Sequence, residues 1–418
     1  MTPTFRALEV RNYRIYATGS LISNTGTWMQ RVAQDWLVLE LTHSGTALGI
    51  TTGLQFLPFL LVTPMAGLIA DRYSKRRLLV LTQASLALSA GVLGLLAVTG
   101  VAHPWHVYAL AFLFGCGTAF DTPARQAFVV EMVGREHLPN AVGLNSASFN
   151  LGRVVGPAVA GFMIAALGSG VQATGAVILI NATTYLAVIY SLKVMDPAAL
   201  ETPVPLAKAK GALRDGVRYV RERPDLVFVF VVAFFAGTFG LNFQMTSALM
   251  ATGEFHKGAG EYGILGTFLA IGSLAGSLLA ARRAHSRRLL LVLAALSFAL
   301  AEITAGLMPS YWLFALWLPV VGVCALTMLN ALQTAVQLTV DSAMRGRVLA
   351  LYMMVLMGGT PAGAPVVGWV GETFGPRWTL IGGGGVTLLA VVAATSWVMW
   401  RQDTHVRDLS VHAAKMAA

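Results

Sequence analysis

Long apolar runs separated by short polar breaks constrain the fold of this chain more than any other feature. A helix needs about 20 apolar residues to cross a hydrocarbon core of ~30 Å, and the runs reach this length. We therefore predict an all-α membrane protein with twelve transmembrane helices. The predicted helices lie near residues 13–39, 46–70, 78–100, 105–131, 140–167, 172–193, 225–252, 261–281, 288–308, 311–340, 345–372 and 377–400.

The positive charges lie almost entirely on one side of this pattern. When the 29 Lys and Arg residues are assigned to alternate loops, 25 fall on the side of the N-terminus. Lys257 and Arg377 fall on the other side, and Arg31 and Arg153 lie inside predicted helices. Cytoplasmic loops carry the excess of Lys and Arg in membrane proteins. We expect both termini in the cytoplasm and the chain in the cell (inner or plasma) membrane.

Composition excludes several other classes of protein. Of the 418 residues 56% are hydrophobic and 11% are charged, whereas soluble domains carry about 25% charged residues. The net charge of +10 is explained by loops that face anionic headgroups, so we expect no nucleic-acid partner. Cys116 and Cys324 fall within predicted spans and provide no disulfide framework. We expect no cleaved signal peptide, no metal and no cofactor.

The longest break divides the chain into two sets of six helices. We predict an N-terminal half at 1–193, a cytoplasmic linker at 194–224, a C-terminal half at 225–400 and a cytoplasmic tail at 401–418. In the linker, Leu206, Leu213, Val217 and Val220 recur at helical spacing among basic residues. This pattern predicts an amphipathic helix on the membrane surface. The alternative is a solvated basic linker without regular structure.

The two halves show a weak internal repeat. Glu131 and Asp341 correspond at an offset of 210 residues, as do Arg135 and Arg345. Repeated six-helix halves are typical of secondary transporters, in which the substrate site lies near the middle of the membrane.

The sharpest motif is GLIADRYSKRR, on the predicted loop between the second and third helices. It resembles a cytoplasmic-loop signature of the major facilitator superfamily, with Ser74 in place of the second glycine. The resemblance implies a charge latch at the cytoplasmic gate, although the charges could also reflect only the positive-inside rule. The residues of this gating motif are Gly67, Asp71, Arg72, Arg76, Arg77 and, on the fourth helix, Glu131.

A second motif lies in the predicted fifth helix and contains Gly152, Gly156, Pro157 and Gly161. It resembles the antiporter motif of drug exporters, which implies packing against the helix at 261–281. Small residues at this spacing also serve close packing of membrane helices in general. The whole stretch 121–161 resembles the drug:proton antiporter-3 branch, which exports siderophores, macrolides and other drugs and includes lysophospholipid movers. One departure is Ala111, where many proton-coupled exporters carry an arginine.

Charged side chains inside the membrane are costly and indicate functional sites. Asn24, Trp28, Arg31 and Asp35 share one face of the first helix, which we expect to face the bundle interior. Arg31 and Asp35 are one turn apart and can pair. The pair is either a coupling site or an ion pair that fixes packing.

Counting residues from the helix ends places Asp121 and Arg153 at similar depth, so contact between them is possible. A static ion pair that only fixes helix packing is the alternative. In the second half Asn242 and a stripe of Asn330, Gln333 and Gln337 are candidate substrate contacts. Glu302 is isolated, and we assign it to no site.

These observations predict a secondary active exporter that moves a drug-like, siderophore-like or other amphipathic small molecule by alternating access. We expect proton coupling through Asp35 with Arg31 as its charge partner, the lipid bilayer as surroundings, and a monomer. A lysophospholipid mover or a solute importer of the same superfamily is the alternative. A polytopic membrane enzyme is a remote one, because the sequence has no nucleotide-phosphate loop, His-Glu-x-x-His or Gly-x-Ser-x-Gly motif.

Overall fold

The computed structural model describes residues 3–201, 212–281 and 288–402, which are almost entirely helical. Side chains are not described for residues 3–4, 63–72, 135, 212–213, 280–281, 288, 342–343 and 401–402. Contacts between residues divide the chain into two units. The first comprises Met1–Ala207 and His256–Thr267, and the second comprises Lys208–Phe255 and Phe268–Ala418.

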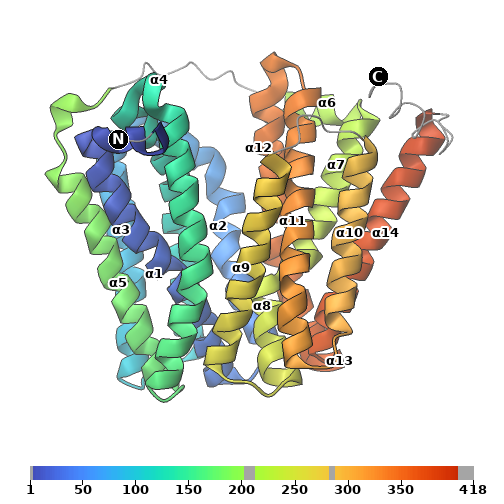
Figure 1. The fold of residues 1–418 in the computed structure, drawn as a ribbon, viewed down its shortest axis with the longest axis horizontal. Coiled ribbons are helices and arrows are strands. Elements are labelled where there is room, and N and C mark those ends of the chain that lie inside the picture. Colours follow the sequence, from blue (N-terminus) through green and yellow to red (C-terminus); the bar gives the residue numbers. More distant parts are fainter. Residues whose placement is uncertain (1–2, 202–211, 282–287, 403–418) are drawn as a thin grey trace. The chain divides into compact units, whose positions relative to one another are not determined.

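The first unit is built from five long helices and the start of a sixth (Figure 1). In it α1 packs against α4 and α5, α3 packs against α5, and α2 packs against α4. Glycines bring the backbones close, since a Cβ at Gly26 would collide with Asn181 and Thr184 of α5. The elements are η1 (Pro3–Glu9), α1 (Arg11–Thr42), α2 (Gly45–Arg72), α3 (Lys75–Val98), α4 (Pro104–Ala166), α5 (Val171–Val194), η2 (Pro197–Ala199) and α9 (Ala259–Ala281).

Two of the helices predicted from the sequence form one element with a reversal. α4 contains both predicted segments, 105–131 and 140–167, and leaves helical geometry at Gly134, where φ is 65° and ψ is −176°. Glycine adopts positive φ without the steric cost of a Cβ, so the chain turns back at this residue (Figure 1). The first and second arms of α4, before and after Gly134, therefore both pack in the same unit.

The second unit contains several interrupted helices. The predicted helix at 225–252 is divided by two π-helical turns, and the predicted helix at 345–372 is broken at Gly359. The linker does contain a helix, α6, although Leu206 lies outside the described residues. The elements are α6 (Ala212–Arg221), α7 (Pro224–Phe235), η3 (Ala236–Gly240), α8 (Phe243–Leu249), η4 (Met250–Glu254), α10 (Arg288–Gly306), α11 (Tyr311–Thr339), α12 (Ser342–Gly358), α13 (Thr360–Phe374) and α14 (Pro376–Gln402).

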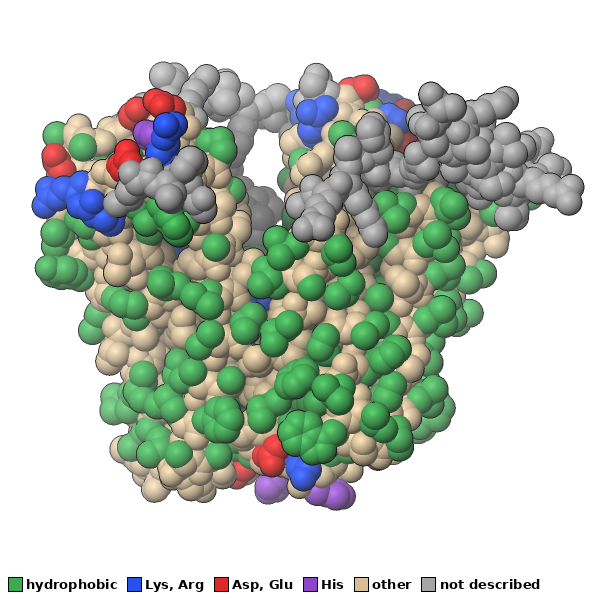
Figure 2. Space-filling view, in the orientation of Figure 1, with side chains coloured by type: hydrophobic (Ala, Val, Ile, Leu, Met, Phe, Trp, Pro, Cys, Tyr) green, Lys and Arg blue, Asp and Glu red, His purple; other side chains and the backbone are tan. Residues whose placement is uncertain are grey.

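The described helices are long and apolar enough for a multi-pass membrane protein. Ten candidate spans are present among them. α1 and the first arm of α4 are not among the ten, and both carry buried polar and charged side chains. On the face shown in Figure 2, charged side chains gather near the helix ends and hydrophobic side chains cover the lengths between them. The chain is therefore a multi-pass membrane protein, while the number of twelve spans stays a prediction.

Candidate functional site

Asp35 lies at the centre of a buried polar cluster in the first unit. The hydroxyl of Tyr262, at the start of α9, donates a hydrogen bond of 2.9 Å to Asp35 Oδ2. The Tyr262 ring stacks on Trp36 with 6.5 Å between centroids, and Trp36 Nε1 donates to the carbonyl of Ser169 at 3.0 Å. Arg31, one turn before Asp35 on α1, interacts with it electrostatically. The carboxylate is thus oriented by groups from two helices.

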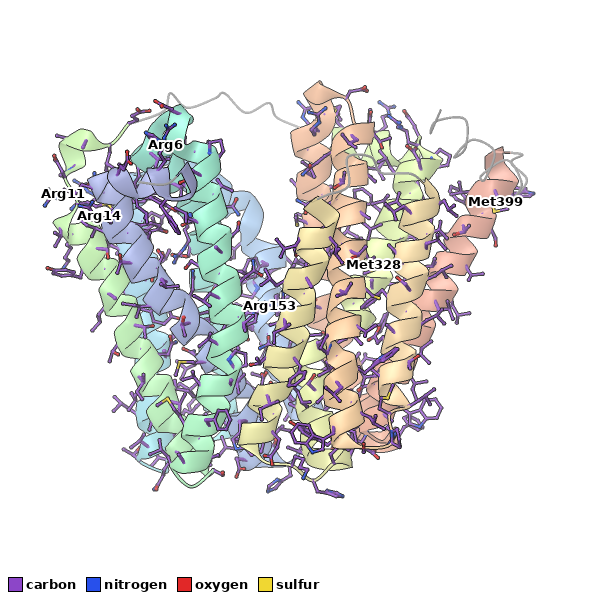
Figure 3. The ribbon with its side chains drawn as sticks, viewed as in Figure 1. Arg6, Arg11, Arg14, Arg153, Met328 and Met399 are labelled. Atoms are coloured by element: carbon purple, nitrogen blue, oxygen red, sulfur yellow. The ribbon has the colours of Figure 1, made fainter. Side chains whose placement is uncertain are left out.

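Two arginines approach one tryptophan beside this cluster. The guanidinium carbon of Arg31 lies 4.8 Å from the Trp28 ring centroid, and that of Arg153 lies 5.6 Å from it. Both distances are in the range of cation–π attraction. Phe149 meets the Trp28 ring edge-on at 5.5 Å. Figure 3 shows Arg153 midway along the second arm of α4, far from the end where Arg6, Arg11 and Arg14 lie.

The rest of the polar face of α1 is bound by neighbouring helices. Asn24 Nδ2 donates to Ser148 Oγ at 3.0 Å, and Gln34 Nε2 donates to Gln55 Oε1 at 3.3 Å. Gln30 accepts a short hydrogen bond from Asn181 of α5. The predicted polar face of Asn24, Trp28, Arg31 and Asp35 therefore faces α4 and α9. Tyr262 was not predicted as a partner, because a single tyrosine in an apolar helix carries no motif.

Asp121 has a different partner from the one that depth counting suggested. Arg125 NH2 lies 2.9 Å from Asp121 Oδ2, and Arg125 Nε donates to the same oxygen at 2.9 Å. Thr82 and Gln83 of α3 each donate to Oδ1 at 2.8 Å. Asp121 therefore pairs with Arg125, one turn away on the first arm of α4, and not with Arg153 on the second arm as suggested. Arg125 lies inside the predicted helix at 105–131, and its spacing of four from Asp121 was a usable signal for this pair.

The gating motif holds a buried ion pair. Lys75 Nζ lies 2.7 Å from Glu131 Oε1, and both side chains are mostly buried. Arg76 donates to the carbonyls of Leu192 and Lys193 at the end of α5, at 2.6 and 3.0 Å, while Arg77 is exposed. The side chains of the remaining motif residues, Gly67, Asp71 and Arg72, lie outside the described ones.

The glycine motif packs against two helices instead of one. A Cβ at Gly156 would lie 2.6 Å from Trp28 Cβ, and a Cβ at Gly152 would lie 2.9 Å from the carbonyl carbon of Asn24. Both glycines therefore lie against α1. α9 meets the motif where Pro157 and Gly161 contact Gly263, and Thr267 of α9 donates to the Val154 carbonyl at 2.8 Å. The expectation that the whole motif packs against the helix at 261–281 is wrong for Gly152 and Gly156. Their spacing shows a packing face but not the partner helix.

The candidate polar residues of the second unit do not share one environment. Asn242 is buried, and its amide donates to the Thr238 carbonyl at 2.9 Å, next to the π-helical turn η3. This hydrogen bond serves the backbone of the broken helix. Asn330, Gln333 and Gln337 lie on one side of α11 and are partly or fully exposed. Among the described residues, no cluster of three or more His, Cys, Asp or Glu side chains is suited to a metal ion.

The sequence profile of one family covers nearly the whole chain. The profile of transmembrane secretion effectors matches residues 2–414. The chain belongs to this family of major facilitator superfamily transporters. The multidrug efflux pump Tap of Mycolicibacterium fortuitum is 28% identical to this transporter over 377 residues, covering 87% of the chain and 90% of Tap. The enterobactin exporter EntS of Escherichia coli O81 is 25% identical over 387 residues, covering 90% and 86%.

Other comparisons cover less sequence or show only the fold. The staphyloferrin A transporter of Staphylococcus aureus is 33% identical over 153 residues, so the match spans 36% of this transporter and 38% of that protein. A bacterial homologue of the human lysosomal transporter Spinster, in an inward-facing and unoccupied conformation, has a TM-score of 0.69 at 17% identity. That alignment covers 98% of this chain and 99% of the homologue. A D-xylose–proton symporter has a TM-score of 0.70 at 13% identity, with coverages of 91% and 96%.

Proposed function

We propose that this transporter exports an amphipathic small molecule that carries an anionic group, by alternating access and with proton entry as the driving force. Relatives that match most of the chain are named as a drug efflux pump and as siderophore exporters, which supports export. The observation that carries the substrate class is the pair of arginines at Trp28.

The charge balance of this cluster favours an anion. Arg31 has Asp35 as a charge partner on the same helix. Arg153 is only half-buried, and no described carboxylate forms an ion pair with it. A cation inside the membrane requires a partner or a wet surface. An anionic group of the substrate is a suitable partner for Arg153, and the aromatic rings of Trp28 and Phe149 suit an apolar or aromatic body beside it.

Proton coupling follows from the same cluster. Burial disfavours the ionised form of Asp35, and in the absence of substrate the Tyr262 hydroxyl and Arg31 oppose this by stabilising the carboxylate. A substrate anion that draws Arg31 away removes that stabilisation, which favours proton uptake by Asp35. Substrate binding and proton binding are then linked, as coupled transport requires.

The topology is part of this proposal. The charge partition supports twelve spans, both termini in the cytoplasm and location in the cell membrane. The proposal also includes two six-helix halves at 1–193 and 225–400, a monomer, and the Lys75–Glu131 pair as part of a cytoplasmic latch. Labelling of single cysteines placed at Lys257 and Arg377 tests the orientation. Cytoplasmic labelling at either position would contradict it.

The test of the substrate class is counterflow in proteoliposomes with an anionic catecholate siderophore, a cationic dye and a lysophospholipid. We expect the anionic probe to exchange, and Arg153→Gln to weaken its binding. A charge-assisted hydrogen bond contributes about 1.5–3 kcal/mol, so the loss in affinity should be roughly tenfold or more. Arg14→Gln, at an exposed arginine, is the matched control and should change nothing. Exchange of the cationic dye alone would contradict the anionic substrate, and exchange of the lysophospholipid alone would indicate a lipid mover.

A further inference from the structure

Glu302 of α10 is a buried acid that the proposed coupling at Asp35 does not use. Its side chain is 0% exposed, and neither carboxyl oxygen has a hydrogen-bond partner among the described residues. The other buried acids differ from it in this respect. Asp35 accepts a hydrogen bond from Tyr262, and Asp121 and Glu131 form ion pairs with Arg125 and Lys75.

The space around the carboxyl is shaped by glycines from two elements. A Cβ at Gly240 of η3 would lie 2.9 Å from Glu302 Oε2, and a Cβ at Gly383 of α14 would lie 3.0 Å from Oε1. The Cβ added at Gly383 would also lie 2.6 Å from the Phe239 carbonyl oxygen, so this oxygen and the carboxyl border the same space. The Phe298 ring forms a further wall beside Gly240. By contrast, a Cβ at Gly382, in the same run of four glycines, would meet nothing within 4 Å.

The elements around α10 bring no opposite charge to this niche. α11 has Tyr311 and Cys324 as its only titratable residues, and η3 and α8 have none. α14 has only Arg377 and Arg401, at its two ends. Arg377 is engaged elsewhere, because its Nε lies 2.8 Å from Glu254 and it donates to the Gly306 carbonyl. An ionised carboxylate without a counter-charge or a donor is too costly in such surroundings, so the group neutralises instead.

We propose that Glu302 is a second proton-binding site, in the second unit, and that it carries its proton in the conformation described here. Release of the proton requires water or a hydrogen-bond donor at the carboxyl, and the element that must move to admit one is η3.

η3 has the structure of a conformational junction. It is a π-helical turn, in which the Leu241 amide donates to the Ala236 carbonyl at 2.8 Å, and such turns often lie at functional sites. Gly240 at its end borders Glu302, whereas Thr238 contacts Gly359 and Gly363 where α12 ends and α13 begins. A shift of η3 that admits water to Glu302 therefore also disturbs the junction of α12 and α13. Protonation of Glu302 would stabilise the packed form of this junction.

Infrared spectroscopy of the purified protein tests the protonation directly and does not depend on the proposed function. We expect the carbonyl stretch of a protonated carboxylic acid at neutral pH. The band should be lost in Glu302→Gln and kept in Asp35→Asn. A band that survives in Glu302→Gln, or no band in the wild type, overturns the proposal. A thermal stabilisation by sodium that is lost in Glu302→Gln also overturns it, because it would show a cation site.

A second set of variants keeps the test usable if Glu302→Gln does not fold. Gly383→Ala crowds the carboxyl and should reduce the band or shift its frequency, whereas Gly382→Ala should leave both unchanged. An unchanged band in Gly383→Ala would contradict the proposed niche. Where transport is measurable, Glu302→Gln should flatten its pH dependence and retain counterflow at fixed pH. This transport measurement rests on the proposed function. If the infrared band behaves as expected but the pH dependence of transport is unchanged in Glu302→Gln, the proposed transport mechanism is wrong and the protonation of Glu302 still holds.

Discussion

The close approach of Gly156 to Trp28 lets us predict how a substitution changes the stability of the protein, without knowledge of the substrate. In Gly156→Ala the new Cβ lies 2.6 Å from Trp28 Cβ and 2.9 Å from the Thr25 carbonyl oxygen. Carbon atoms prefer separations of about 3.5–4 Å, so α1 and α4 must move apart. Overpacking of this kind costs about 1–3 kcal/mol. Gly143→Ala, on the same arm of α4, is the matched control because its Cβ would meet nothing within 4 Å.

Both variants gain the same helix propensity, about 0.8–1 kcal/mol for Ala over Gly, so their difference isolates the contact. We expect Gly156→Ala to be less stable than Gly143→Ala by about 1–3 kcal/mol. The assay is thermal unfolding in detergent, followed by tryptophan fluorescence at one heating rate. For a chain of this size the difference corresponds to about 1–4 °C in apparent Tm per kcal/mol. Equal Tm values for the two variants would refute the close packing of α1 on α4.

Two further predictions concern polar contacts at the helix ends. Lys75→Met leaves the mostly buried Glu131 without its ion pair, so we expect a loss of about 1.5–3 kcal/mol and slower transport with unchanged substrate affinity. Normal transport with weakened substrate binding would contradict a latch role. Tyr219→Phe removes the hydroxyl that donates to Asp341 at 2.8 Å and accepts from Arg223 Nη1 at 2.9 Å, so unfolding in detergent should show a loss of about 1.5–3 kcal/mol. Tyr73→Phe, at a tyrosine that is 66% exposed, is the control, and an equal effect there would refute the contact.

Much of the fold could be predicted from hydropathy, because each apolar run must form a helix when water cannot satisfy its backbone. The reversal of α4 at Gly134 lies in the break predicted between residues 131 and 140, where a glycine permits the positive φ. The pattern could not show the two π-helical turns in the helix at 225–252, because such turns leave no periodic signal.

The candidate site was predictable where the signal lay within one helix. The face shared by Asn24 and Trp28 follows from helical spacing alone, and the structure places both against α4. Partners across helices were not predictable, since Tyr262 is 227 positions from Asp35. Counting depth failed for Asp121, because a closer arginine on the same helix satisfied its charge first.

Transport driven by a pH gradient in proteoliposomes that contain Asp35→Asn tests whether Asp35 is the coupling acid. Asparagine keeps an oxygen that can accept the Tyr262 hydrogen bond but cannot exchange a proton at neutral pH. We predict that the variant no longer accumulates substrate against its gradient and still performs counterflow. Accumulation at the wild-type level would show that Asp35 is not the coupling acid.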